Sequence, residues 1–141
     1  MERRTQADRS EAMRARLLNA TIDCLAHSGY GRMSTNDVVR RAHVSRGALA
    51  HHFPTKAALV TAAAEQLVDS RGREFREQLS ALDPSRRTAD EALAVLWSFY
   101  DDPTGLALIE LTVASRAYPE LKVVLRRMED QIAAITAEMV L

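Results

Sequence analysis

The segment 34–53 holds polar and basic residues suited to one chemistry in particular, contact with a nucleic acid. Ser34 and Ser45 each precede a short stretch with helical patterning, and serine oxygens favour the position that caps the first turn of a helix. We therefore expect two short helices, over 35–42 and 46–53, with a tight turn between them. The free N–H groups at a helix start attract phosphate, and the DNA major groove admits a helix. This pattern predicts a helix-turn-helix.

The distribution of apolar residues in this segment supports the prediction. Positions where two crossed helices must touch are apolar or small, and these are Val38, Ala42, Val44, Leu49 and Phe53. The positions left to face outward are Arg46, Ala48, His51 and His52. We expect the outward set to form the surface that enters a DNA groove.

The elements that must position this segment also have a helical pattern, so the sequence predicts an all-α fold. Glycine and proline number only 5 and 4 and fall mostly at breaks, and no apolar–polar alternation is long enough for a sheet. The other expected helices cover 9–28, 55–78, 88–100, 104–117 and 119–141.

The last expected helix carries an apolar seam with alternating steps of four and three residues. Its members are Leu121, Leu125, Met128, Ile132, Ile135 and Met139. Such a seam predicts packing along another helix. The pattern stops at Val140 and Leu141 without a cap, so we expect the natural domain to be longer, with partner helices missing from this chain.

The charge distribution also favours a polyanion as partner of the N-terminal part. The 141-residue chain has no net charge, with 19 Lys and Arg against 19 Asp and Glu. Residues 1–60 hold 10 basic and 5 acidic residues, a net charge of +5, and residues 61–141 hold 9 and 14, a net charge of −5. A basic module joined to an acidic remainder is typical of a chain whose basic part meets nucleic acid, although a solvated charged surface is the alternative.

Other function classes lack their signatures. The single cysteine, Cys24, excludes a disulfide framework and a Cys-based zinc site, and we expect it to be buried on the first helix. No apolar run is long enough for a membrane span and no secretory signal is present, so the expected compartment is the cytoplasm. None of the motifs G-x-S-x-G, H-E-x-x-H, the P-loop or G-x-G-x-x-G occurs, so we expect no enzyme and no cofactor. The neighbouring His51 and His52 point too far apart to share a metal ion.

Residues 34–59 resemble the TetR family of bacterial transcriptional regulators. The family pattern is a Ser/Thr-capped helix, then A-x-V-S-x-G, an aliphatic residue and F-x-x-K-x-x-L. The matching segments here are Ala42-His43-Val44-Ser45-Arg46-Gly47, Leu49 and Phe53-Pro54-Thr55-Lys56-Ala57-Ala58-Leu59. The preceding helix and the Gly29-Tyr30 loop match as well, so the resemblance extends over residues 9–70.

The resemblance implies an N-terminal three-helix DNA-binding unit followed by a C-terminal helical bundle for ligand binding and dimerisation. In this chain those domains would be residues 9–70, with the motif at 34–53, and residues 71–141, a partial bundle. It further implies a homodimer that reads a palindromic operator, with half-sites about one helical turn apart. Most such proteins repress transcription, and a small molecule that shifts the long fourth helix releases the DNA.

The family's DNA contacts carry over to individual positions. The resemblance implies phosphate contacts for Ser34 and Thr35, base contacts for Arg46, Ala48 and His51, and backbone contacts for His52 and Lys56. Ser45 caps the reading helix, and Gly47 permits close approach to DNA. Two positions depart from the pattern. Ala50 replaces an aromatic phosphate contact, and His43 replaces the turn glycine in a left-handed position that histidine tolerates better than most residues.

The second half offers four residues for a small-molecule effector, namely Trp97, Tyr100, Glu110 and Arg116. The aromatic residues Trp97, Phe99 and Tyr100 could instead pack in the core. Glu110 is the only charged residue in an otherwise apolar helix, and the alternative to an effector contact is a structural ion pair with Arg116 or Arg127. The sequence thus predicts a ligand-responsive DNA-binding regulator. The alternative function is a helical ligand-binding or interaction module with a weakened DNA-binding head, an alternative that Ala50 keeps open.

Overall fold

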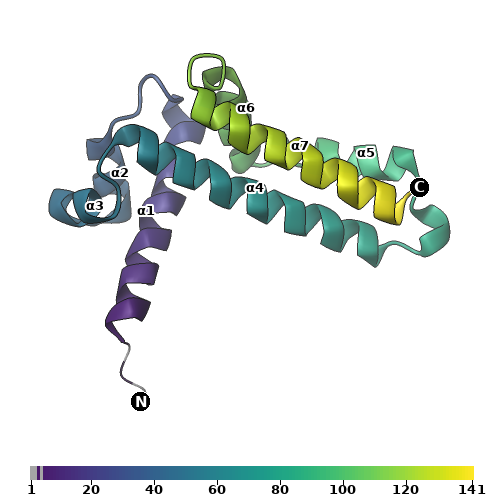
Figure 1. Cartoon of the computed structure of the whole chain (residues 1–141), viewed down its shortest axis with the longest axis horizontal. Helices are drawn as coiled ribbons and strands as arrows, with labels where there is room; N and C mark the ends of the chain where they lie inside the picture. Colours follow the sequence, from purple (N-terminus) through teal and green to yellow (C-terminus); the bar gives the residue numbers. More distant parts are fainter. Residues whose placement is uncertain (1–2, 4) are drawn as a thin grey trace.

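The computed structural model describes Arg3 and residues 5–141, and in these residues the chain is all-α, as predicted (Figure 1). Seven α-helices and one short 3-10 helix make up the described part, which contains no strand. No described helix combines the length and apolarity needed to cross a membrane. The elements are α1 Gln6–Ser28, α2 Thr35–Ala42, α3 Arg46–His52, α4 Lys56–Ala81, η1 Pro84–Arg86, α5 Ala89–Ser98, α6 Pro103–Ala114 and α7 Pro119–Met139.

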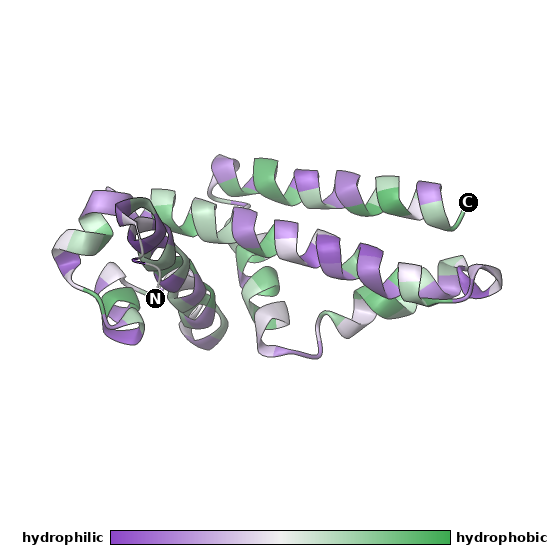
Figure 2. Ribbon diagram, turned by 90° about the horizontal axis from the view of Figure 1, so that it is seen from below, coloured by the Kyte–Doolittle hydropathy of each residue, from purple (hydrophilic) through white to green (hydrophobic). Residues whose placement is uncertain are grey.

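The helices form a head and an elongated body joined by α4. Helices α1, α2 and α3 gather at one end of the molecule, and α4 runs from them along the body (Figure 1). Helix α7 lies beside α4, whereas α5 and α6 lie on another side of it (Figures 1 and 2). Helix α6 packs against α1, so the body contacts the head directly as well as through α4.

Two clusters of buried side chains hold these parts together. The larger cluster combines residues of the head with residues of α4, α6 and α7, among them Leu17, Val38, Leu59, Leu111 and Leu121. The smaller cluster lies toward the far end of α4 and consists of Phe75, Leu79, Ala92, Phe99 and Ile135. Because the larger cluster is continuous from head to body, a displacement of α4 or α6 must be accommodated in the packing of the head.

Helix bounds differ from the predicted ones by up to three residues, for identifiable reasons. Helix α1 begins at Gln6 because Thr5 and Asp8 form a reciprocal capping box. Helix α4 continues to Ala81, and helices α5 and α6 end earlier than predicted, at Ser98 and Ala114. The break predicted after α4 is present and contains η1.

The predicted seam of α7 is confirmed as a packing face against α4. Leu121, Leu125 and Ile135 are buried, and hydrophilic and hydrophobic residues alternate along the helix (Figure 2). Ion pairs also connect the two helices. Arg127 donates to Asp69 at 3.1 Å, and Arg76 and Glu138 form a two-bond pair at 3.0 Å.

A buried arginine, which the sequence analysis missed, fixes α4 to the loop between α5 and α6. Arg71 is only 4% exposed, and its guanidinium donates to Asp102 at 2.6 and 2.8 Å and to Glu74 at 2.8 Å. It also contacts Thr104 and lies 4.8 Å from the ring centroid of Phe99. The pKa of Asp102 is lowered: burial acts to raise it, but hydrogen bonds from Thr104, the Gly105 N–H and Arg71 outweigh that effect.

Candidate DNA-binding surface

The two short helices α2 and α3 are joined as a helix-turn-helix requires. Ser34 caps α2 and forms a reciprocal capping box with Asp37, whose Oδ2 accepts a hydrogen bond of 2.8 Å from the Ser34 N–H. These hydrogen bonds hold the pKa of Asp37 below its usual value. His43 adopts the left-handed conformation, with φ 55° and ψ 47°, and its N–H bonds to carbonyls at the end of α2. The turn therefore forms with histidine in the place of glycine.

Two arginines of α1 support this motif, and neither was predicted to do so. The Nη2 of Arg16 donates to the carbonyl of Ala42 at 2.6 Å and to that of His43 at 3.3 Å. The guanidinium of Arg14 lies 5.4 Å from the ring centroid of Phe53, the residue that ends α3. Nothing in the spacing of α1 marks these arginines, because the carbonyls they contact are distant in the sequence and become neighbours only in the fold.

Helix α3 presents an exposed face. Its cap, Ser45, accepts a hydrogen bond of 3.1 Å from the N–H of Ala48. The anchoring residues Leu49 and Phe53 are buried, as predicted. The exposed residues on and beside the helix are Ser45, Arg46, Gly47, Ala50 and His51, and the half-buried ones are Ala48 and His52. Ala48 is thus less accessible than a base-reading residue was expected to be.

A cleft beside this face brings together residues from the starts of α2, α3 and α4. Its volume is about 360 Å³, and its lining includes Thr35, Arg46, Ala50, Thr55 and Lys56. Thr35, Arg46 and Lys56 were predicted DNA contacts, and Ala50 holds the position of the family's aromatic contact, so the fold gathers these positions on one surface. The N-termini of α2 and α4 also lie here, and both add partial positive charge. An anionic group of phosphate size fits such a place.

Lys56 has an internal function that the sequence did not indicate. Its ammonium donates to the carbonyls of Tyr30 at 2.6 Å and Met33 at 2.8 Å, and lies 4.5 Å from the ring centroid of Tyr30. Burial lowers the pKa of Lys56. An ammonium has three hydrogens, so one remains for a phosphate. Lys56 therefore fixes the loop between α1 and α2, which leads directly to Ser34 and Thr35.

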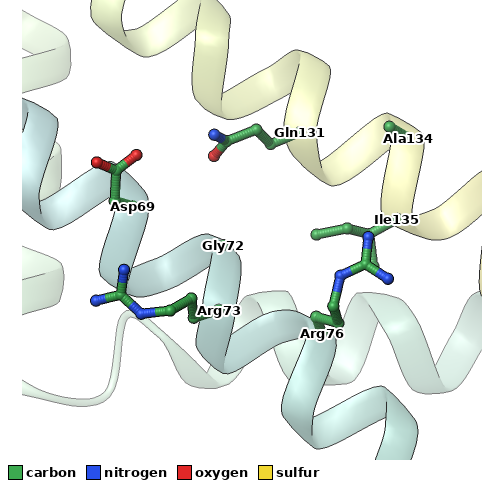
Figure 3. Close-up of a pocket in the computed structure, with 7 residues that line it drawn as sticks. All are labelled: Asp69, Gly72, Arg73, Arg76, Gln131, Ala134 and Ile135. Carbon is green, nitrogen blue, oxygen red and sulfur yellow. The ribbon is translucent and has the colours of Figure 1, made fainter.

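The four predicted effector residues do not form one site, although the rings of Trp97 and Tyr100 lie near each other, with centroids 6.0 Å apart. Trp97 is 71% exposed and Tyr100 is 44% exposed, because α5 turns Ala92 and Phe99 toward the core instead. The core alternative therefore holds for Phe99 and is wrong for Trp97. Arg116 lies exposed beyond α6, and none of the four residues lines the cleft beside α3 or any of four further cavities on the described residues, one of which opens between α4 and α7 (Figure 3).

The ion pair suggested for Glu110 with Arg127 or Arg116 is also absent from the described part of the chain. Arg127 faces α4 and pairs with Asp69. Glu110 faces α1 instead, where a Cβ placed on Gly29 would come within 2.6 Å of its Oε2. Gly29 has a φ of 76°, so both its conformation and its contact with Glu110 favour glycine.

Comparison with known proteins agrees with this geometry. The sequence model of the family described as "Bacterial regulatory proteins, tetR family" matches residues 17–63, from the second half of α1 to the first turns of α4. The uncharacterized HTH-type transcriptional regulator Rv2912c of Mycobacterium tuberculosis is 35% identical over 131 residues, covering 93% of this chain and 67% of the relative. The chain belongs to the TetR family.

Further relatives extend the likeness beyond the head. The HTH-type transcriptional regulator CymR of Pseudomonas putida is 31% identical over 138 residues, covering 98% of this chain and 68% of the relative. A solved structure from Streptomyces coelicolor A3(2), assigned as a transcriptional regulator, is 25% identical with a TM-score of 0.77, covering 90% of this chain and 75% of that one. A structure from Rhodococcus sp. assigned to the TetR family is 25% identical with a TM-score of 0.72, and the match covers 91% of this chain and 69% of that one. This TetR-family chain is a DNA-binding transcriptional regulator.

Proposed function

We propose that this TetR-family regulator is a repressor that binds a palindromic operator as a homodimer and releases it when a small molecule binds the body. The observation that carries the proposal is the surface around α3, where a capped and exposed helix stands beside a cleft that gathers Thr35, Arg46 and Lys56. In this proposal residues 9–70 form the DNA-binding domain and residues 71–141 belong to the ligand-binding and dimerisation domain. The protein acts in the cytoplasm, as a non-enzymatic regulator.

In this proposal the exposed side chains of α3 read the operator. Arg46 and His51 reach base edges in the major groove, and the lack of a side chain at Gly47 lets the backbone approach the DNA. Ala48 adds an apolar contact from the first turn of α3. Ser34 and Thr35 bind phosphate at the start of α2, next to the cleft.

In this proposal two further residues, His52 and Lys56, contact the DNA backbone, and Ala50 lacks the contact that the family's aromatic residue makes. His52 is half-buried beside Phe53, with ring centroids 6.3 Å apart, and in this proposal it contacts the DNA backbone rather than the bases. Lys56 holds the α1–α2 loop with two hydrogens and offers the third to a phosphate of the same cleft. Ala50 lines that cleft with only a methyl group, so no aromatic ring occupies the position where the family pattern has one.

Two contacts connect the body with the proposed DNA-binding surface. The rings of Tyr30, in the α1–α2 loop, and Tyr118, at the start of α7, have centroids 4.4 Å apart. Tyr30 in turn lies beneath the ammonium of Lys56. A ligand that moves α7 or α4 would therefore displace the loop that presents Ser34 and Thr35. In the proposal, this displacement lowers operator affinity.

A second candidate function is a ligand-binding or interaction module whose head binds DNA weakly and without sequence preference. It is favoured by Ala50 and by the engagement of Lys56 in internal hydrogen bonds. The two candidates differ in sequence preference, because phosphate contacts alone give no discrimination between sequences.

A mobility-shift assay with the duplex upstream of the protein's own gene tests the proposal. We expect binding that outcompetes random DNA and weakens steeply with salt. Equal affinity for the upstream duplex and for random DNA would favour the module instead, provided that a library of random sequences also yields no preferred operator. Sedimentation of the free and DNA-bound protein tests the dimer, for which we expect two chains per palindrome.

A further inference from the structure

The turn between α2 and α3 sets the angle at which α3 leaves α2, and it contains a residue in a costly conformation. His43 has a φ of 55° and a ψ of 47°, and it is the only described residue other than glycine with a positive φ. Glycine adopts this left-handed conformation freely, whereas the Cβ of any other L-residue makes it unfavourable. Contacts that hold His43 in this conformation must therefore offset its cost.

The backbone supplies part of this stabilisation. The N–H of Val44 donates to the carbonyl of Val39 at 3.1 Å, and the N–H of His43 donates to that of Arg40 at 3.4 Å. These two bonds form the Schellman motif, which commonly ends a helix. Val39 is buried and Val44 is half-buried, which suits the apolar contact that often accompanies the motif. Neither bond involves the carbonyl of Ala42 or that of His43.

Arg16 of α1 binds those two carbonyls. Its Nη2 donates to the carbonyl of Ala42 at 2.6 Å and to that of His43 at 3.3 Å. These carbonyls belong to the two peptide groups that flank the Cα of His43, and the planes of these groups define its φ and ψ. One guanidinium therefore restrains both dihedral angles of this residue. The bonds are charge-assisted, and a cation is also favourable at the C-terminal end of α2.

The conformation of His43 determines where α3 lies. Ser45, which caps α3, follows two residues later, and Arg46 is the first residue of the helix. A rotation at His43 would swing α3 as a unit and move Arg46 relative to the start of α2. Hydrogen bonds to base edges tolerate little change in distance or angle, whereas sequence-independent attraction to phosphates tolerates more. A loosened turn should therefore impair sequence reading more than general affinity for DNA.

We propose that Arg16 is a positioning residue for sequence reading. By binding the carbonyls on both sides of His43, it fixes the angle between α2 and α3 and so places Arg46 at the base edges. This inference rests on the proposed function, since it takes α3 as the helix that reads the operator. Arg16 acts through the turn and not through the DNA, unlike the phosphate contacts proposed for Thr35 and Lys56.

Arg16→Met tests the role in DNA binding, because it removes the guanidinium and keeps an unbranched side chain. The probes are the duplex upstream of the protein's own gene and a scrambled duplex of equal length. We expect about tenfold weaker binding of the upstream duplex, since a charge-assisted hydrogen bond is worth about that factor. Binding of the scrambled duplex should stay within about twofold, because phosphate contacts are retained. The control Arg126→Met, which removes an exposed arginine of α7, should change neither affinity.

The salt dependence separates a positioning role from a direct DNA contact. We expect Arg16→Met to keep the slope of log affinity against log salt concentration, since it removes no phosphate contact. A slope reduced by about one would show that Arg16 itself binds a phosphate, and this would overturn the proposal. An unchanged ratio between the two duplex affinities would also overturn it.

His43→Gly provides a rescue that only a positioning role predicts. Glycine adopts the left-handed conformation without the cost that histidine bears, so the turn no longer depends on Arg16. In the double variant of Arg16→Met and His43→Gly, we expect both duplex affinities within about twofold of those of the unmodified chain. All affinities are measured where circular dichroism shows each variant to be folded, so a general loss of stability does not enter. A loss of operator affinity that glycine does not restore would overturn the proposal.

Amide hydrogen exchange in the DNA-free chain tests the turn separately from the proposed function. In Arg16→Met the amides of His43 and Val44 should exchange about tenfold faster, whereas the amide of Leu59, in the first turn of α4, should not change. Unchanged exchange at the turn would overturn the inference.

The two proposals fail in distinguishable ways. If the unmodified chain prefers the upstream duplex and Arg16→Met keeps that preference, the inference about Arg16 fails and the proposed function stands. If the unmodified chain shows no preference for any operator although exchange at the turn rises as expected, the proposed function fails, and the role of Arg16 in reading fails with it.

Discussion

Replacing Arg71 by methionine tests the structural account of how α4 is fixed to the α5–α6 loop. The substitution keeps much of the buried stem and removes the guanidinium that contacts Asp102 and Glu74. Breaking a fully buried ion pair costs about 3–5 kcal/mol. Here the two carboxylates are 47% and 42% exposed and regain water, so we expect a loss of about 2–3 kcal/mol in the free energy of unfolding.

The assay is urea unfolding at pH 7 of four proteins: the unmodified chain, Arg71→Met, Asp102→Asn and the double variant. Both carboxylate oxygens of Asp102 accept a hydrogen bond from Arg71, so this double-mutant cycle should give a coupling energy of about 1–2 kcal/mol between the two residues. The exposed pair of Arg86 and Glu91 serves as control, and Arg86→Met should change stability by less than about 0.5 kcal/mol. A loss below about 1 kcal/mol for Arg71→Met, or additive effects in the cycle, would refute the reasoning.

Three further predictions follow from the head and its contacts. Lys56→Met should lower operator affinity and reduce the salt slope by about one, and an unchanged slope in a mobility-shift series would contradict the phosphate contact. Tyr118→Ala should weaken operator binding although position 118 lies outside the head, and a filter-binding constant equal to that of the unmodified chain would contradict the coupling through Tyr30. The folded state lowers the pKa of Asp37 and of Asp102, so the stabilisation that these carboxylates provide is present above the unfolded pKa, near 3.8, and is lost as the pH falls through the lower folded pKa. Asp102→Asn lacks this stabilisation, so its acid unfolding, followed by circular dichroism, should have its midpoint at a higher pH. An unshifted midpoint would contradict the prediction.

The fold could largely be predicted because its signals are local. Caps such as Ser34 with Asp37, breaks at proline and the seam of α7 act within a few residues, and each has the predicted effect. The ends of α1 and α4 were less well predicted, since a capping box at Thr5 and continued packing of α4 extend those helices.

The residues of the proposed DNA-binding surface lie close together along the chain, so the sequence alone was enough to propose the surface. The contacts that support it could not be predicted from the sequence. Arg16, Arg14 and Lys56 bind carbonyls or rings that are distant in the sequence, and an exposed-looking basic residue gives no sign of such a partner.

The separation of the four residues predicted for an effector could not be foreseen, for a related reason. Their identification rested on residue type, whereas a cavity depends on which faces of two helices meet and how much room they leave. Trp97 points away from the core although its helix is apolar.

The central claim is that exposed side chains of α3 read a specific DNA sequence, and the most direct measurement is a competition binding assay with Arg46→Ala. The operator duplex and a scrambled duplex of equal length are titrated with the unmodified chain and the variant at one salt concentration. We predict that Arg46→Ala loses about 1–3 kcal/mol of operator affinity and much less for the scrambled duplex, so that the specificity ratio falls. An unchanged ratio would contradict the assignment of α3 as the helix that reads DNA through Arg46.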